Sequence, residues 1–194
     1  MSSQNLNEGK VIIFSAPSGA GKTTIVRALL DELSELSFSI SACSRDPRGQ
    51  EVNGKDYHFI GIEGFKKKIK NNEFVEWEEV YQDHFYGTLN SELTRIWNAN
   101  KTVVFDVDVV GGMSLKKKFG KKALAIFVMP PSLVVLEERL RNRNTDSEQK
   151  IQQRLEKAEH EISLSSGFDV ILKNDKLDTA ISEAKSIINQ FLVS

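Results

Sequence analysis

Four short, predominantly apolar runs are separated by segments with helical periodicity. The runs cover residues 11–15, 102–108, 123–129 and 168–175. Continuous rather than alternating apolar positions are typical of strands buried on both faces, so the pattern predicts a parallel sheet flanked by helices. Residues 24–36 predict one such helix. A second helix is predicted by an apolar stripe at Leu177, Ala180, Ile181, Ala184, Ile187, Ile188 and Phe191.

Two stretches depart from this alternation of strands and helices. Residues 38–92 are rich in turn residues and aromatic residues, which predicts a small β-rich insert. Residues 137–158 predict a charged helical pair, broken at residues 141–146, and we expect the lid that contains it, residues 132–158, to be mobile. At 194 residues the chain has room for one well-filled core. We therefore expect a single domain whose core consists of residues 9–37, 93–131 and 159–194.

Composition narrows the range of partners and compartments. The 26 basic and 27 acidic residues give a net charge of -1, so we expect neither a nucleic acid polymer nor a membrane as partner. No apolar run approaches the ~18 residues of a membrane span, and no signal peptide is visible. The single cysteine, Cys43, fits a reducing compartment. The cytoplasm is the predicted location.

The stretch "SAPSGAGKTT" at residues 15–24 joins the first predicted strand to the first predicted helix. It matches the P-loop pattern G-x-x-x-x-G-K-[ST] except that Ala16 replaces the first glycine, so the loop should begin without a left-handed residue there. Backbone N–H groups, the Lys22 ammonium and the Thr23 hydroxyl would hold phosphates and Mg²⁺. The residues expected to contact the phosphorylated ligand are Ala16, Pro17, Ser18, Gly19, Ala20, Gly21, Lys22, Thr23 and Thr24. The predicted architecture is therefore a P-loop NTPase-like α/β core.

Two acids, Asp106 and Asp108, end the second apolar run. Residues two apart lie on one side of a strand, and two carboxylates there are costly without a cation or donor nearby. We assign Asp106, with Thr23, to the Mg²⁺ shell and Asp108 to the acceptor nucleotide. The alternative is that these acids cap a helix that follows Gly111 and Gly112.

Five of the eight arginines lie in the insert and the lid at spacings that could converge on anions: Arg45, Arg48, Arg139, Arg143 and Arg154. The planar guanidinium suits phosphate oxygens, although a lone surface arginine is usually only solvated. The insert also holds hydroxyl donors at Ser41, Tyr57 and Tyr86. Glu51 and Glu76 could form a general acid and base pair. An acceptor that is a phosphate monoester, with a second pKa of about 6, needs no base, and Glu76 is then available for recognition.

Ordered segments along the chain resemble guanylate kinases from about Val11 to Phe191. The segment "SRDPRGQEVNGKDYHF" at residues 44–59 is similar to the family signature S/T-R-x-P-R-x-G-E-x-x-G-x-x-Y-x-F. Further similar segments are "NEFVEWEEVYQDHFYGT", "DVDVVGG", the lid from "PPSLVV" to "EHEI", and "FDVILKNDKLDTA". The chain departs from the pattern at Gly49-Gln50, where the signature glycine is displaced, and at Val110 and Asn144.

The resemblance implies transfer of the γ-phosphoryl group of ATP to GMP, with Mg²⁺, to give ADP and GDP. It implies that Ser41, Arg45, Arg48, Tyr57 and Tyr86 hold the GMP phosphate, and that Glu76, Thr88 and Asp108 recognise guanine. Arg139 and Asn174 would lie near adenine, and the catalytic set would be Lys22, Arg45, Arg143 and Arg154. Glu51 stays outside this set because of the displaced glycine. We expect a monomer or a homodimer.

Two other functions stay open at this point. A guanylate-kinase-like scaffold module would grip a phosphorylated peptide through Arg45, Arg48 and Tyr57, but it would not need Lys22 or Thr23. Another P-loop kinase of small molecules would select a different acceptor. Histidines 58, 84 and 160 have no metal-ligand spacing, and Cys43 has no base at a fixed local offset.

Overall fold

The computed structural model describes residues 9–142 and 147–194. By their internal contacts these residues form two compact units. The first consists of Gly9 with residues 37–103, and the second consists of residues 10–36 and 104–194. The division into core, insert and lid stays a prediction, and each unit is described here by itself.

A five-stranded sheet confirms the predicted α/β class. β1 pairs in parallel with β8, and β8 in parallel with β9. Every residue of β1 is buried, as are six of the seven in β8, which is why these strands are continuously apolar. The strands follow the order β2 (Leu36–Phe38), β7 (Thr102–Asp106), β1 (Val11–Ser15), β8 (Ala123–Met129) and β9 (Val170–Lys173). β7 and β9 are shorter than the predicted runs 102–108 and 168–175.

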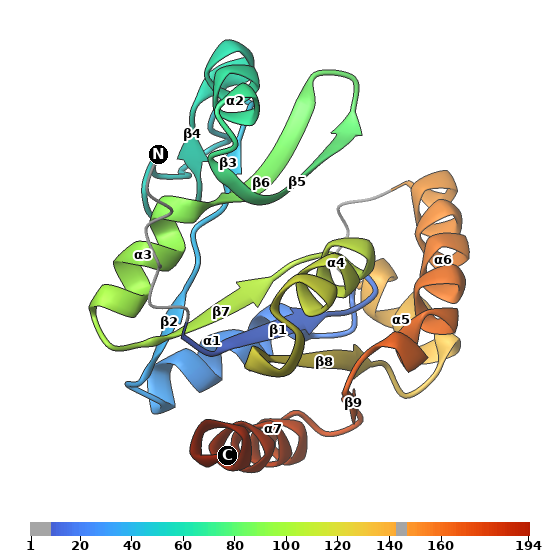
Figure 1. The fold of residues 1–194 in the computed structure, drawn as a ribbon. Coiled ribbons are helices and arrows are strands. Elements are labelled where there is room, and N and C mark those ends of the chain that lie inside the picture. The colour runs from blue at the N-terminus through green and yellow to red at the C-terminus, as the bar shows by residue number, and fades with distance from the viewer. Residues whose placement is uncertain (1–8, 143–146) are drawn as a thin grey trace. The chain divides into compact units, whose positions relative to one another are not determined.

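Helices pack against the strands of the second unit (Figure 1). α4 (Val109–Phe119) contacts β1 and β8, while α1 (Lys22–Glu32) contacts β1 and α7 (Leu177–Val193). In α7 the predicted stripe is buried at Ala180, Ala184 and Ile188, but its first member, Leu177, is exposed. The unit also contains two short 3-10 helices, η1 (Gly120–Lys122) and η2 (Ser165–Gly167).

The predicted helical pair is present as α5 (Leu133–Arg141) and α6 (Glu148–Ser163). The two helices bury Leu136, Leu140 and Ala158 between them. α6 runs to Ser163, five residues beyond the predicted end of the lid at residue 158. The mobility of this pair stays a prediction. No helix in the two described ranges combines the length and the apolar content that a membrane span requires.

The first unit contains a four-stranded sheet and two helices, which confirms the predicted β-rich character of residues 38–92. One face of its sheet packs on α2 through stacked rings, with Phe65 4.3 Å from Phe74 and 5.4 Å from Phe85 between ring centroids. The strands follow the order β4 (His58–Phe59), β3 (Ala42–Cys43), β6 (His84–Leu89) and β5 (Phe74–Tyr81). The helices are α2 (Gly61–Lys70) and α3 (Asn90–Asn98).

A β-bulge in β5 sends Phe74 and Glu76 to opposite faces of this sheet. Phe74 pairs with Leu89 and Glu76 with Thr88, so Val75 is an extra residue on β5. Because directly paired residues share a face, Phe74 lies with Leu89 on the face covered by α2. Glu76 lies with Thr88 on the other face. In a regular strand, residues two apart would have shared one face.

Gly87 permits the close strand approach beside this bulge. A Cβ at Gly87 would lie 2.6 Å from the Glu76 carbonyl oxygen and 2.7 Å from the Trp77 Cβ. Real Cβ atoms do not approach a backbone this closely, so only glycine fits here without a shift of β5. Gly87 pairs with Trp77, next to the bulge, so the bulge and this glycine together shape the strand pair at this point.

We expect Gly87→Ala to lower the free energy of unfolding by about 1 to 3 kcal/mol, because the added methyl group overpacks the strand pair. Thermal melts followed by circular dichroism measure the change, at about 2 to 4 °C per kcal/mol for a chain of this size. Gly64→Ala is the matched control, since a Cβ in α2 would lie an ordinary 3.6 Å from Ile60. That variant should gain about 0.5 to 1 kcal/mol from helix propensity. Equal melting temperatures for the two variants would contradict the proposed close approach.

Candidate active site

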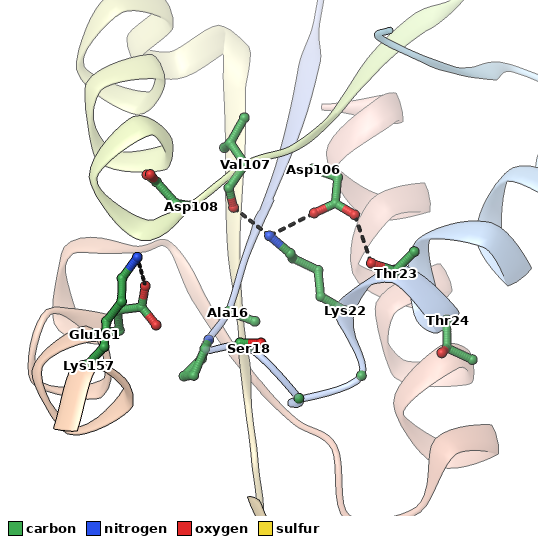
Figure 2. Close-up of a pocket in the computed structure, with 13 residues that line it drawn as sticks. Ala16, Ser18, Lys22, Thr23, Thr24, Asp106, Val107, Asp108, Lys157 and Glu161 are labelled. Atoms are coloured by element: carbon green, nitrogen blue, oxygen red, sulfur yellow. Dashed lines mark hydrogen bonds and ion pairs between the residues drawn. The ribbon is translucent and has the colours of Figure 1, made fainter. Parts of the chain in front are cut away.

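The P-loop joins β1 to α1 and borders a pocket of about 360 Å³ (Figure 2). Within the loop the positive φ angles occur at Gly19 (97°) and Gly21 (94°), while Ala16 keeps an ordinary backbone, as its side chain led us to expect. The loop ends at the N-terminus of α1, where unpaired N–H groups and the helix dipole favour an anion. The remaining walls of the pocket come from the end of β7 and from α6.

Lys22 and Thr23 both bind the Asp106 carboxylate. The Lys22 Nζ lies 2.7 Å from Asp106 Oδ1 and 2.5 Å from the Val107 carbonyl oxygen. The Thr23 hydroxyl donates to Asp106 Oδ2 over 3.2 Å. Figure 2 shows Thr24 pointing away from this group. The structure therefore brings together the predicted phosphate lysine and the two predicted Mg²⁺ ligands.

The donor set at this point fits a hard divalent cation. A hydroxyl and a carboxylate 3.2 Å apart are oxygen ligands of the kind that Mg²⁺ prefers, with its remaining positions taken by phosphate oxygens and water. Among the described residues no group of three or more His, Cys, Asp and Glu side chains could hold a metal by itself.

Arg139 and Asn174 hold the backbone of the P-loop. The Ala20 carbonyl accepts from Asn174 Nδ2 at 2.7 Å and from Arg139 Nη1 at 3.4 Å. Arg139 Nη2 also donates to the Asn174 carbonyl at 3.1 Å. Asn174 is only 4% exposed. Both residues thus lie against the loop, and their contact with adenine stays a prediction.

Of the two arginines predicted to reach the ATP phosphates, Arg154 is described. Its Nη1 donates to the Ser18 hydroxyl at 3.0 Å, which places it beside the P-loop. Arg143 lies outside the described residues.

The sequence reasoning missed Lys157 and Glu161, which also line this pocket. They lie 3.6 Å apart, Lys157 Nζ to Glu161 Oε1. Burial raises the pKa of Glu161, which is 8% exposed, and Lys157 opposes that shift. Their spacing of three and seven residues after Arg154 puts them on the same face of α6. That spacing was the signal in the sequence.

Asp108 does not lie on the strand, contrary to the prediction that it shares one side of a strand with Asp106. β7 ends at Asp106, and Asp108 is the N-cap of α4, where its Oδ1 accepts from the Gly111 N–H at 2.6 Å. A capping carboxylate satisfies an unpaired helix N–H group and complements the helix dipole. Gly111 and Gly112 lie inside α4 rather than before it. The capping alternative is therefore correct for Asp108, and contact with guanine stays a prediction.

In the first unit, Arg45 lies at the centre of a group of residues that includes predicted phosphate ligands. Its Nη1 and Nη2 donate to the two Glu51 carboxylate oxygens at 2.6 and 2.8 Å, and its Nε donates to the Tyr86 hydroxyl at 3.0 Å. The guanidinium also lies 5.1 Å from the ring centroid of Tyr57. Ring centroids of Tyr57 and Tyr86 are 5.9 Å apart. Three of the residues predicted to hold the GMP phosphate are thus brought together.

Glu51, which the sequence reasoning left outside the site, is the carboxylate that holds Arg45. The hydrogen bonds from Arg45, together with the Arg48 N–H at 2.8 Å, lower the pKa of Glu51 to about 2. The same pairing raises the pKa of Arg45. Gly49 takes the left-handed conformation in this turn, with φ of 54°. The displaced glycine therefore still allows Glu51 to reach the arginine.

The remaining residues predicted to bind GMP occupy the same unit. Ser41 directly precedes β3, and its carbonyl accepts from the His58 N–H at 2.9 Å, whereas Arg48 is exposed. Glu76 and Thr88 face each other across β5 and β6. The Thr88 hydroxyl is buried and has no hydrogen-bond partner within the described ranges. An unpaired buried hydroxyl is costly, which makes a bound polar ligand its expected partner.

Comparison with known proteins agrees with this geometry. A family model described as guanylate kinase matches residues 8–191. A guanylate kinase from Porphyromonas gingivalis is 52% identical over 184 residues, which cover 94% of this chain and 98% of that relative. A guanylate kinase from Bacteroides fragilis is 50% identical over 185 residues, which cover 95% and 91%.

A solved structure agrees as well. The crystal structure of guanylate kinase from Anaplasma phagocytophilum is 26% identical, with a TM-score of 0.76, and the match covers 97% of this chain and 89% of that chain. Because the family model and these relatives span nearly the whole sequence, the chain belongs to the guanylate kinase family.

Proposed function

We propose a division of work among the described residues for the transfer of the γ-phosphoryl group of ATP to GMP, which gives ADP and GDP. The chain is an enzyme of this reaction, since guanylate kinases at 50% identity or more match over nearly its full length. The observation that supports the proposal best is the Lys22, Thr23 and Asp106 group at the N-terminus of α1. A scaffold module that binds a phosphorylated peptide gives no reason for that group.

On the ATP side, the Lys22 ammonium leaves the Asp106 carboxylate and binds the terminal phosphates of ATP. Its ammonium is held by oxygen atoms that a phosphate can replace, so binding leaves no unpaired buried charge on the lysine. Thr23 and Asp106 would hold Mg²⁺, which when bound neutralises charge on the phosphate oxygens. Arg154 and the predicted Arg143 add positive charge at the transferring group, where such arginines lower the barrier.

On the GMP side, Arg45 binds the phosphate together with Ser41, Arg48, Tyr57 and Tyr86. Glu51 stays ionised at neutral pH, because its pKa is about 2, and so keeps the Arg45 fork in place before the nucleotide arrives. No general base is required, since a phosphate monoester with a second pKa of about 6 is already ionised at neutral pH. The attacking oxygen therefore needs alignment rather than deprotonation.

Guanine is read by Glu76 and Thr88. The carboxylate accepts from the N1–H and the 2-amino group, a donor pair that adenine lacks. A site built for such hydrogen bonds rejects an analogue without them by roughly 10⁴ to 10⁵. A cytoplasmic location, and a monomer or homodimer, stay predictions from the sequence.

A panel of acceptors tests the function directly. With ATP and Mg²⁺, a coupled assay of ADP release should show turnover of GMP and little of AMP, CMP or UMP. Preference for AMP would overturn the role of Glu76. Activity with none of the four monophosphates would overturn the assigned reaction.

Lys22→Met should lower kcat by roughly 10² to 10³, because one preorganised positive charge is lost from the transition state. The melting temperature should change by only a few degrees, because Asp106 keeps its hydrogen bond from Thr23. Lys117→Met, at an exposed position of α4, is the control and should keep full activity. A loss of activity no larger than the accompanying loss of folded protein would indicate a purely structural role.

Glu76→Gln should raise the KM for GMP by about 10- to 100-fold, because a hydrogen bond to a charged acceptor is lost. The preference for GMP over IMP, which lacks the 2-amino group, should narrow in the same steady-state measurements. Glu63→Gln is the matched control, since Glu63 is an exposed acid in the first turn of α2 of the same unit. If both variants raised the KM equally, general loss of negative charge would explain the effect better than recognition of guanine.

A further inference from the structure

Glu92 is a buried carboxylate that the proposed mechanism does not use. It lies in the first turn of α3 and is 5% exposed. Its Oε2 accepts from the Ile40 N–H at 3.1 Å and from Arg95 Nη2 at 2.8 Å, and its Oε1 accepts from Arg95 Nε at 3.0 Å. The His58 Nε2 lies 3.3 Å from Oε1. A carboxylate only accepts, so the imidazole carries its proton on Nε2 in this contact.

The pairing keeps Glu92 charged. Burial acts to raise the pKa of Glu92, but hydrogen bonds from Arg95 and the Ile40 N–H outweigh it and hold that pKa below its ordinary value. A buried charge is costly unless it is paired and hydrogen-bonded. Charge-assisted bonds of this kind are also the strong ones, so they fix the groups that donate them.

Two of those donors are direct chain neighbours of residues proposed to bind the GMP phosphate. Ile40 precedes Ser41, and His58 follows Tyr57. β3 and β4 pair through only two residues each, Ala42 with His58 and Cys43 with Phe59. Two backbone hydrogen bonds, from the His58 N–H to the Ser41 carbonyl and from the Ile60 N–H to the Cys43 carbonyl, hold this short ladder, so its ends gain from further contacts. Glu92 contacts the chain at this end of both strands. It accepts from the Ile40 N–H just before β3 and from the His58 imidazole in β4.

We propose that Glu92 is a positioning residue for GMP, which sets the separation of the Ser41 and Tyr57 hydroxyl groups by tying Ile40 to His58. This inference rests on the proposed role of Ser41 and Tyr57 at the phosphate. Glu92 itself touches no substrate. Arg95 completes the arrangement by balancing its charge.

The competing explanation is that Glu92 only stabilises the unit. An acid in the first turn of a helix is favoured by the helix dipole, and a buried ion pair can serve folding alone. A purely structural role predicts loss of melting temperature without selective loss of GMP affinity. The KM values for the two substrates separate these explanations.

Glu92→Gln keeps the shape of the side chain but turns an amide N–H₂ toward one of the donors. Steady-state kinetics should show the KM for GMP raised about 5- to 20-fold and the KM for ATP changed less than about twofold. Phe65→Leu is the control, because Phe65 is buried in the core of the same unit and takes no part in the hydrogen bonds of Glu92. At a matched loss of melting temperature it should leave the KM for GMP within about twofold.

A double-mutant cycle with Ser41→Ala tests whether Glu92 acts through Ser41. The double variant should raise the KM for GMP little beyond the larger single effect, because both changes remove the same contact. Fully additive effects, or an unchanged KM in Glu92→Gln, would overturn the role of Glu92 and leave the proposed function of the chain in place. An unchanged KM in Ser41→Ala would instead overturn the proposed role of Ser41, and the inference with it.

His58→Ala provides the same test should Glu92→Gln fail to fold. The His58 side chain is 29% exposed, so its removal leaves no large cavity. It removes only the attachment to β4, and the KM for GMP should rise about 2- to 5-fold with the KM for ATP unchanged. No selective rise in this variant would count against the inference.

Discussion

The ion pair between Lys22 and Asp106 is the contact on which the P-loop unit depends. A parallel sheet brings the carboxyl ends of β1 and β7 to one edge, so the loop after β1 meets the acid that ends β7. Each side chain is 16% exposed, so each charge is favoured there by its partner. Thr23, Arg139 and Asn174 then secure the same loop from its other sides. In this pocket the oxygens of a bound phosphate can therefore replace the Asp106 carboxylate and the Val107 carbonyl as partners of Lys22.

The sequence predicted this part of the molecule well, because the signals are local. Continuous apolar runs identified the strands, and the glycine and lysine spacing identified the loop between β1 and α1. The error at Asp108 arose from extending a period of two beyond the end of β7. The chain turns at Val107, whose N–H donates to the Phe14 carbonyl, and α4 begins at once. Within α4, residue 112 is a glycine because a Cβ there would meet the Ser15 side chain and, at 3.2 Å, the Phe168 ring. Ser15 and Phe168 are both far from Gly112 in the sequence, so the sequence pattern could not indicate that a glycine is required inside the helix.

The first unit was predicted less completely, for a related reason. The resemblance named Arg45, Tyr57 and Tyr86, but their arrangement follows from pairing between strands that are distant in the chain. A glycine displaced by one position argues against Glu51 in the sequence, yet its carboxylate accepts from both terminal nitrogens of Arg45. Glu92 carried no motif at all. Its importance comes from Ile40 and His58, which lie 52 and 34 residues away in the sequence.

The extra residue at Val75 also constrains how this chain can vary. Upstream of it, Phe74 is committed to the packed face, and downstream Glu76 is committed to the opposite one. Deleting a single residue here would straighten the strand and exchange the two surfaces, with an acid turned into the aromatic core. A substitution along β5 leaves the register of the strand unchanged, whereas a change in the number of its residues does not. Relatives that keep this purine preference should therefore align across the segment without gaps.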